Sequence, residues 1–202
     1  QDMQEGFTYL ETGKYAKAET FFQNILKDHP NNKTARLCYG RAIGLNGKPE
    51  QANTLFTNLL ADYPTDFEVK LNYGESLLWN SNFPKAKTYF KSLIDEDPKS
   101  FPALLSYANT LSNLKEYEDA LIYVDKALTV LPGNPNALTS KKYIYLGYAY
   151  QKQQARQYDE AEALLKKNLI LFNNDKDTLL NLANLYLIAN RLDDAKATYD
   201  IL

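Results

Sequence analysis

Small and large apolar residues recur at helical spacing along the chain, and the same pattern appears several times. A glycine or alanine is followed twelve residues later by an alanine, and four residues after that by a large apolar residue. Residues four apart share one face of a helix, so each copy predicts two helices that pack through their apolar faces. The small residues of the first helices are Gly6, Gly40, Gly74 and Ala108, and the alanines of the second helices are Ala18, Ala52, Ala86, Ala120, Ala161 and Ala195.

A proline closes each of the first four copies. Proline lacks an N–H and restricts the residue before it, so it is expected to follow the end of each second helix. The four prolines Pro30, Pro64, Pro98 and Pro132 are 34 residues apart, and a 34-residue period is typical of helix–turn–helix repeats stacked into a solenoid. The copies are predicted at 1–32, 33–66, 67–100, 101–134, 135–175 and 176–202, with the first and last incomplete. Turns are predicted near 12–14, 46–48, 80–82, 114–116, 154–157 and 190–191.

Several first helices carry a recognisable motif. In the fifth copy Tyr143, Leu146, Gly147 and Tyr150 follow the order large, leucine, small, tyrosine, and the later alanine, large apolar and proline positions complete the pattern. The chain therefore resembles the tetratricopeptide repeat family over its whole length. The resemblance implies an all-α, right-handed superhelical solenoid of about six antiparallel helix pairs, here treated as one domain over residues 1–202. It also implies a protein-binding role, with the first helices on the concave side.

The fifth copy is longer than the others. Ala120 and Ala161 are 41 residues apart, seven more than the period. Alignment of Gly147 with the earlier glycines predicts five extra residues near 135–139 and two within 154–157, with a helix that begins near Asn136. The expansion is either a tolerated insertion at a helix end or a feature that contacts a partner or changes the superhelix pitch.

Composition limits the classes of partner. Hydrophobic residues make up 45% of the chain, so it can form a core. The formal charge is −2 with acids and bases interspersed, which predicts no nucleic-acid partner and no anionic membrane surface. No apolar run approaches the roughly 20 residues of a membrane span. The single cysteine leaves a cytoplasmic or a bacterial periplasmic location open.

Candidate chemistry is sparse. His29 and Cys38 are the only histidine and cysteine, and they cannot form a zinc site without carboxylates. No glycine-rich phosphate loop and no nucleophile–base arrangement stands out. We therefore predict no enzyme activity, no cofactor and no metal site.

A partner surface is predicted from the phase of the first helices. Leucine recurs three residues before the small residue, and mostly polar residues follow directly after it. The predicted partner contacts are Leu37, Arg41, Leu71, Glu75, Leu78, Trp79, Leu105, Asn109, Tyr148 and Asn184. An apolar and a polar row together suit an extended peptide or a helix. The alternative is that the leucines and Trp79 simply pack against neighbouring helices.

One subset of the family grips chain-terminal carboxylates through basic residues and asparagines. The matching positions here are Met3, Phe7, Cys38, Glu68 and Asn72, which lack the required charge. We therefore predict that the chain does not bind chaperone tails. The predicted function is a non-catalytic scaffold for a peptide or protein partner. Two alternatives are the periplasmic repeat portion of an envelope or exopolysaccharide-export protein, and a regulatory repeat domain fused to an enzyme or DNA-binding domain. In each case the chain is expected to be a fragment of a longer protein.

Overall fold

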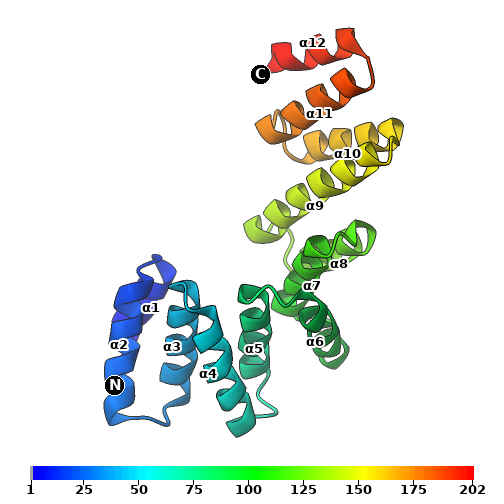
Figure 1. Ribbon diagram of the computed structural model, residues 1–202. Coiled ribbons are helices and arrows are strands. Elements are labelled where there is room, and N and C mark those ends of the chain that lie inside the picture. The colour runs from blue at the N-terminus through cyan, green and yellow to red at the C-terminus, as the bar shows by residue number, and fades with distance from the viewer. Residues whose placement is uncertain (1) are drawn as a thin grey trace. The chain divides into compact units, whose positions relative to one another are not determined.

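The computed structural model describes residues 2–202, which form twelve α-helices and no strand (Figure 1). The predicted all-α solenoid of six helix pairs is thus confirmed for this part of the chain. First and second helices alternate. The pairs are α1 (Gln4–Glu11) with α2 (Tyr15–Asp28), α3 (Lys33–Leu45) with α4 (Pro49–Asp62), α5 (Phe67–Trp79) with α6 (Phe83–Glu96), α7 (Phe101–Asn113) with α8 (Tyr117–Val130), α9 (Pro135–Gln154) with α10 (Tyr158–Leu171), and α11 (Lys176–Ile188) with α12 (Leu192–Ile201).

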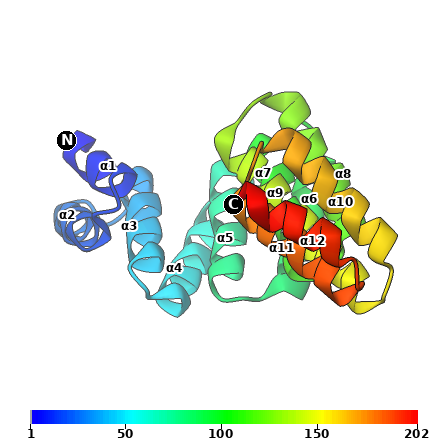
Figure 2. The same cartoon turned by 90° about the horizontal axis from the view of Figure 1, so that it is seen from above.

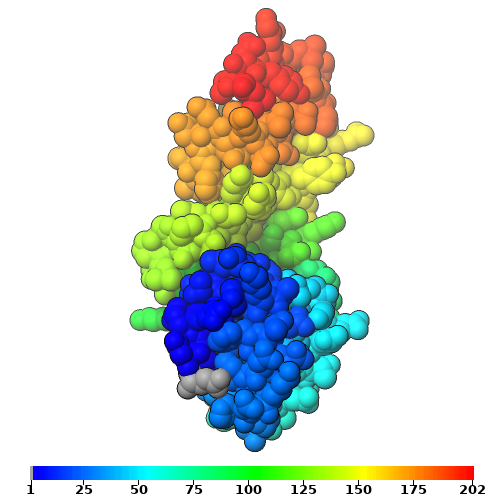
Figure 3. All heavy atoms as spheres, turned by 90° about the vertical axis from the view of Figure 1, so that its left-hand side faces the viewer, coloured from blue at the N-terminus to red at the C-terminus, as the bar shows by residue number. Residues whose placement is uncertain are grey.

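The chain divides into two compact units, Gln1–Asp97 and Pro98–Leu202. In the first unit α2, α3 and α4 lie side by side in chain order, as Figures 1 and 2 both show. In the second unit α9 contacts both α7 and α11, so the first helices are neighbours there. The space-filling view shows the later helices of this unit, from yellow to red, stacked one after another (Figure 3). Each unit therefore has its own sequence of stacked pairs.

The same three-residue turn joins the two helices of every pair, at the positions predicted from the sequence. Its middle residue has a positive φ, and the residue after it donates its N–H to a carbonyl five residues earlier, as Lys48 does to Ile43 at 2.9 Å. This hydrogen bond satisfies a carbonyl at the helix end that would otherwise be unpaired. The middle residues are Gly13, Gly47, Ser81, Lys115, Arg156 and Asn190.

In two of these turns a residue with a long side chain has a left-handed backbone conformation. Lys115 has φ 62° and Arg156 has φ 59°, where a β-carbon crowds the backbone. Lys115→Gly and Arg156→Gly are each expected to stabilise the protein by up to about 1 kcal/mol. Thermal denaturation checks this, with Gly47→Ala as the opposite control because it adds a β-carbon at φ 85°. A lower melting temperature for both glycine variants would contradict the assignment of strain.

The core lies where the two helices of a pair cross. Ala18, Ala52 and Ala86 have no exposed surface, as predicted for the small residues of the second helices. A β-carbon added to Gly40 would lie 2.5 Å from the Phe56 ring, and one added to Gly74 would lie 2.6 Å from Phe90. The ring four residues after each alanine therefore fills the space that the small residue leaves free.

Side-chain caps begin the first helices. The side-chain oxygens of Asn32, Asp66 and Ser100 accept hydrogen bonds from backbone N–H groups three residues later. Asn134 and Asp175 cap α9 and α11 in the same way. The prolines lie two residues beyond the ends of α2, α4, α6 and α8, so the predicted ends of the second helices are confirmed.

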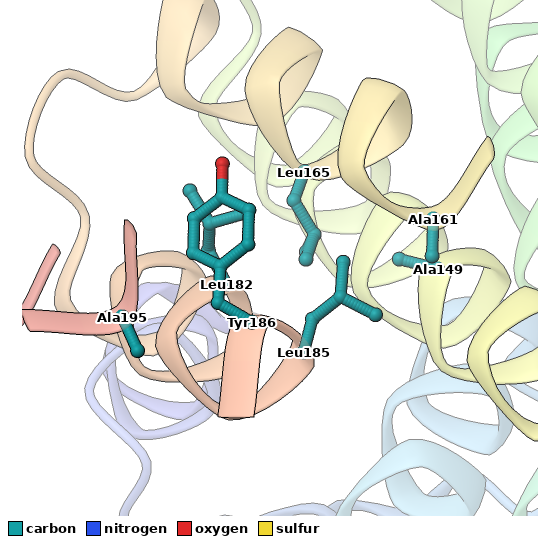
Figure 4. Close-up of a cluster of buried hydrophobic side chains, with 7 residues drawn as sticks. All are labelled: Ala149, Ala161, Leu165, Leu182, Leu185, Tyr186 and Ala195. Atoms are coloured by element: carbon teal, nitrogen blue, oxygen red, sulfur yellow. The ribbon is translucent and has the colours of Figure 1, made fainter. Parts of the chain in front are cut away.

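The predicted register of the fifth first helix is wrong by two residues. Ala149, not Gly147, belongs to the buried cluster that contains Ala161, and Figure 4 shows these two alanines against each other. A β-carbon on Gly147 would instead meet Tyr117 of α8. Ala149 also restores the twelve-residue distance to the alanine of the second helix. All seven extra residues therefore precede Ala149, and α9 reaches 20 residues where α7 and α11 have 13.

A buried polar network ties this longer helix to the next pair. The Asn168 side chain of α10 is fully buried and donates to the Lys142 carbonyl at 3.3 Å and to Thr178 Oγ1 at 3.0 Å. Thr178 Oγ1 donates in turn to Asp175 Oδ2 at 2.7 Å, and Lys142 Nζ lies 2.8 Å from Asp175 Oδ1. The network therefore links α9, α10 and α11 through side chains of Lys142, Asn168 and Thr178.

Candidate protein-binding surface

One side of each first helix is more accessible than the opposite side. In α11, for example, Leu180, Asn184 and Leu187 are exposed, whereas Leu182, Ala183 and Leu185 are buried. We call this side the first-helix face. It comprises the residues six and three before, and one, four and five after, the small residue of a first helix. The predicted partner contacts belong to it, apart from Tyr148.

In the first unit this face carries charge. Arg41 of α3 forms an ion pair with Glu75 of α5, with an N–O distance of 2.5 Å, and also donates to Asn72 Oδ1 at 3.0 Å. Both charged side chains are about one-third exposed. The two residues are 34 apart, so equivalent positions in successive repeats hold opposite charges. Reversal of either charge alone would break this pair as well as alter the surface.

Trp79 packs mainly within the protein. Its ring lies on Gly44 of α3, where no room remains for a β-carbon, and its centroid is 6.2 Å from that of Phe56. Leu37 is only 5% exposed. Both residues therefore have a packing role, as the alternative interpretation of the sequence proposed. Leu71 and Leu78 are half-buried and remain accessible in part.

In the second unit the face is apolar and aromatic. Tyr143 and Tyr150 of α9 are 55% and 57% exposed, and Leu180 and Leu187 of α11 are 43% and 46% exposed. Asn109 of α7 is half-buried. Asn184 is exposed, and its Oδ1 accepts a hydrogen bond from the Tyr199 hydroxyl at 3.2 Å. The four large side chains are accessible and come from the neighbouring helices α9 and α11.

The two-residue shift in α9 changes which residues reach this face. Tyr148 stacks on Tyr117 of α8, with ring centroids 5.9 Å apart, and Tyr150 takes the position equivalent to Asn109 and Asn184. Ile144, three residues before Gly147, is buried, and Leu146 lies three residues before Ala149 on the accessible side. Tyr143 and Tyr150 were therefore missed as surface residues. Counting back twelve residues from Ala161 leads to Ala149, and the two tyrosines lie six residues before and one residue after it.

The single thiol of the chain is partly shielded from solvent. Cys38 is half-buried, and burial raises the pKa of its thiol to about 11, so the reactive thiolate form is scarcer than for an ordinary cysteine. Within residues 2–202, no group of three or more histidine, cysteine, aspartate or glutamate side chains could hold a metal ion. No helix in the described range has both the length and the apolar character needed to span a membrane.

Comparison with known families agrees with the fold. Models of the tetratricopeptide repeat match residues 3–32, residues 46–100 and 74–135, and residues 153–202. The chain belongs to the tetratricopeptide repeat family. Residues 136–152, between the last two matches, contain most of α9, which is seven residues longer than the other first helices of its unit. Among curated proteins, none matches the sequence.

Solved structures of tetratricopeptide repeat proteins have the same fold. A repeat protein of Parabacteroides merdae gives a TM-score of 0.67 at 18% identity, over 98% of this chain and 76% of that chain. The pilF protein of Pseudomonas aeruginosa gives a TM-score of 0.66 at 18% identity, over 97% of this chain and 86% of that chain. A chain of the APC/C hetero-tetramer Cut9–Hcn1 gives a TM-score of 0.66 at 18% identity, over 96% of this chain and 38% of that chain. At these identities the likeness concerns the fold alone.

Proposed function

We propose that the chain is a non-catalytic scaffold that holds a segment of a partner protein on its first-helix face. The exposure of large apolar side chains carries this proposal, since Tyr143, Tyr150, Leu180 and Leu187 are between 43% and 57% exposed on neighbouring helices. Covering such side chains removes apolar surface from water, and contiguous apolar patches mark interaction sites.

The family supports the same conclusion. Tetratricopeptide repeats are generally protein–protein interaction scaffolds. One similar solved chain comes from the Cut9–Hcn1 hetero-tetramer, which contains two different proteins. In the first unit the proposed contacts are Leu71, Glu75 and Leu78, with Arg41 as the partner of Glu75. In the second unit they are Leu105, Asn109 and Asn184 from the sequence, and Tyr143, Tyr150, Leu180 and Leu187 from the structure. The placement of the chain in an export protein or beside an enzyme or DNA-binding domain remains a prediction.

Site-specific photo-crosslinking tests the proposal. A benzophenone side chain in place of Leu187 is expected to crosslink a partner protein in an extract of the source organism. The same group in place of Ile170 of α10 is the control, because Ile170 is 83% exposed but lies outside the first-helix face. Crosslinks of equal yield at both positions, or products at Ile170 alone, would place the partner elsewhere.

A further inference from the structure

The first-helix face of the second unit is almost free of charge. The face in α7, α9 and α11 comprises Pro102, Leu105, Asn109, Ser112, Asn113, Tyr143, Leu146, Tyr150, Gln153, Gln154, Asp177, Leu180, Asn184, Leu187 and Ile188. Asp177 is the single charged residue among these fifteen, whereas 24% of all residues in the chain are charged. The face in α3 and α5 differs, because it contains Arg41, Glu68 and Glu75.

Three lysines of α9 next to this surface form ion pairs within the protein. Lys141 Nζ lies 2.7 Å from Asp125, Lys142 Nζ lies 2.8 Å from Asp175, and Lys152 Nζ lies 2.7 Å from Glu160. Lys142 also lies 3.6 Å from Asp177, so the single carboxylate of the face has a cation beside it. These pairs leave little net charge to attract a charged partner segment.

Side-chain amides accompany the apolar residues. Asn109, Asn113, Gln153, Gln154 and Asn184 contribute five such groups, each of which can both donate and accept hydrogen bonds. The backbone of an extended segment has free N–H and C=O groups that match these amides. The backbone of a helix is already paired with itself and has no such need.

From these observations we infer that the second unit binds an extended, uncharged protein segment whose apolar side chains contact Tyr143, Tyr150, Leu180 and Leu187. This inference rests on the proposed function and adds the chemistry of the partner. A charged residue in the segment would lose water without gaining an opposite charge, which disfavours it. The surface therefore selects against lysine, arginine, aspartate and glutamate.

Selection from a random library of twelve-residue peptides against the whole chain tests the inference. Peptides whose binding is mapped to α7, α9 and α11 by hydrogen exchange are expected to contain few charged residues. Their dissociation constants, measured by fluorescence anisotropy, should change less than about twofold between about 50 and 500 mM NaCl, because screening acts only on charge.

Matched variants identify the surface. Tyr150→Lys and Leu187→Lys are each expected to weaken these peptides about tenfold or more, since aromatic and apolar anchors contribute most of the binding energy. Ile170→Lys adds the same charge at an exposed apolar residue outside the face and should leave affinity unchanged. Circular dichroism melting confirms that each variant is folded.

The outcomes separate this inference from the proposed function. Peptides that protect α7, α9 and α11 but are charged, and weaken as salt rises, would overturn the uncharged segment and leave the scaffold function standing. Neutral peptides that bind the Tyr150→Lys variant as well as the original would also overturn the inference. Peptides that protect only second helices would contradict both.

Discussion

Ala161→Leu is expected to destabilise the second unit by about 2 to 3 kcal/mol, because the packed core has no space for a leucine side chain at this position. Ala161 has no exposed surface and faces Ala149 across the crossing of α9 and α10 (Figure 4). Three extra carbons there force the two helices apart or push Leu165 and Leu185 from their positions. Denaturant unfolding followed by circular dichroism measures the loss.

A control for this experiment lies two residues along the same helix. Ala163 is exposed, so Ala163→Leu makes the same chemical change in the same helix without entering the core. Its effect should stay within about 0.5 kcal/mol. Ala149→Leu should behave like Ala161→Leu, because both alanines occupy the same crossing. Equal stability of the Ala161 and Ala163 variants would show that the crossing is not tightly packed.

Asp175→Ala is expected to lower the free energy of unfolding by about 2 to 3 kcal/mol, because one carboxylate makes three contacts. Asp175 accepts from the backbone N–H of Thr178 at 3.0 Å as the cap of α11, accepts from the Thr178 hydroxyl, and pairs with Lys142. The loss of a cap costs about 1 kcal/mol, and a mostly buried network that loses an acceptor costs about 1 to 3 kcal/mol. Thermal and denaturant unfolding both report the change.

Asp175→Asn separates the charge from the cap. Asparagine caps a helix as well as aspartate does, so this variant loses only the charged contact with Lys142. Burial raises the pKa of Asp175, but hydrogen bonds from Lys142 and Thr178 outweigh burial and lower it below its ordinary value. The stability from the charge is therefore complete above the carboxyl group's unfolded pKa and disappears as pH falls through the lower folded pKa. The gap between the wild-type protein and Asp175→Asn should close in acid, and a constant gap would contradict this role for the charge.

Periodicity made most of the fold predictable. The glycine, alanine and proline positions locate turns and helix ends because each residue type meets a local steric demand that recurs in every copy. Arg41 and Glu75 occupy equivalent positions 34 residues apart, but only the structure shows that their side chains form an ion pair.

The fifth copy shows where a motif misleads. Tyr143, Leu146, Gly147 and Tyr150 match the family pattern two residues out of register, since tyrosine is common throughout α9. The distance back from Ala161 is the better guide, because the turn of three residues fixes where a first helix must place its small residue. The role of Trp79 depended on which way its ring points, and spacing along the chain carries no such information.

The extension of α9 has a consequence for how such repeats change length. Seven residues rotate an α-helix to within about 20° of two full turns while lengthening it by about 10 Å. Gain or loss of seven codons thus leaves every side chain of the helix pointing almost where it pointed before, whereas five codons would rotate the earlier part by about 140° and turn its polar side inward. In this chain the longer repeat therefore differs from the others by nearly two whole turns of helix, which keeps both parts of α9 in the same orientation.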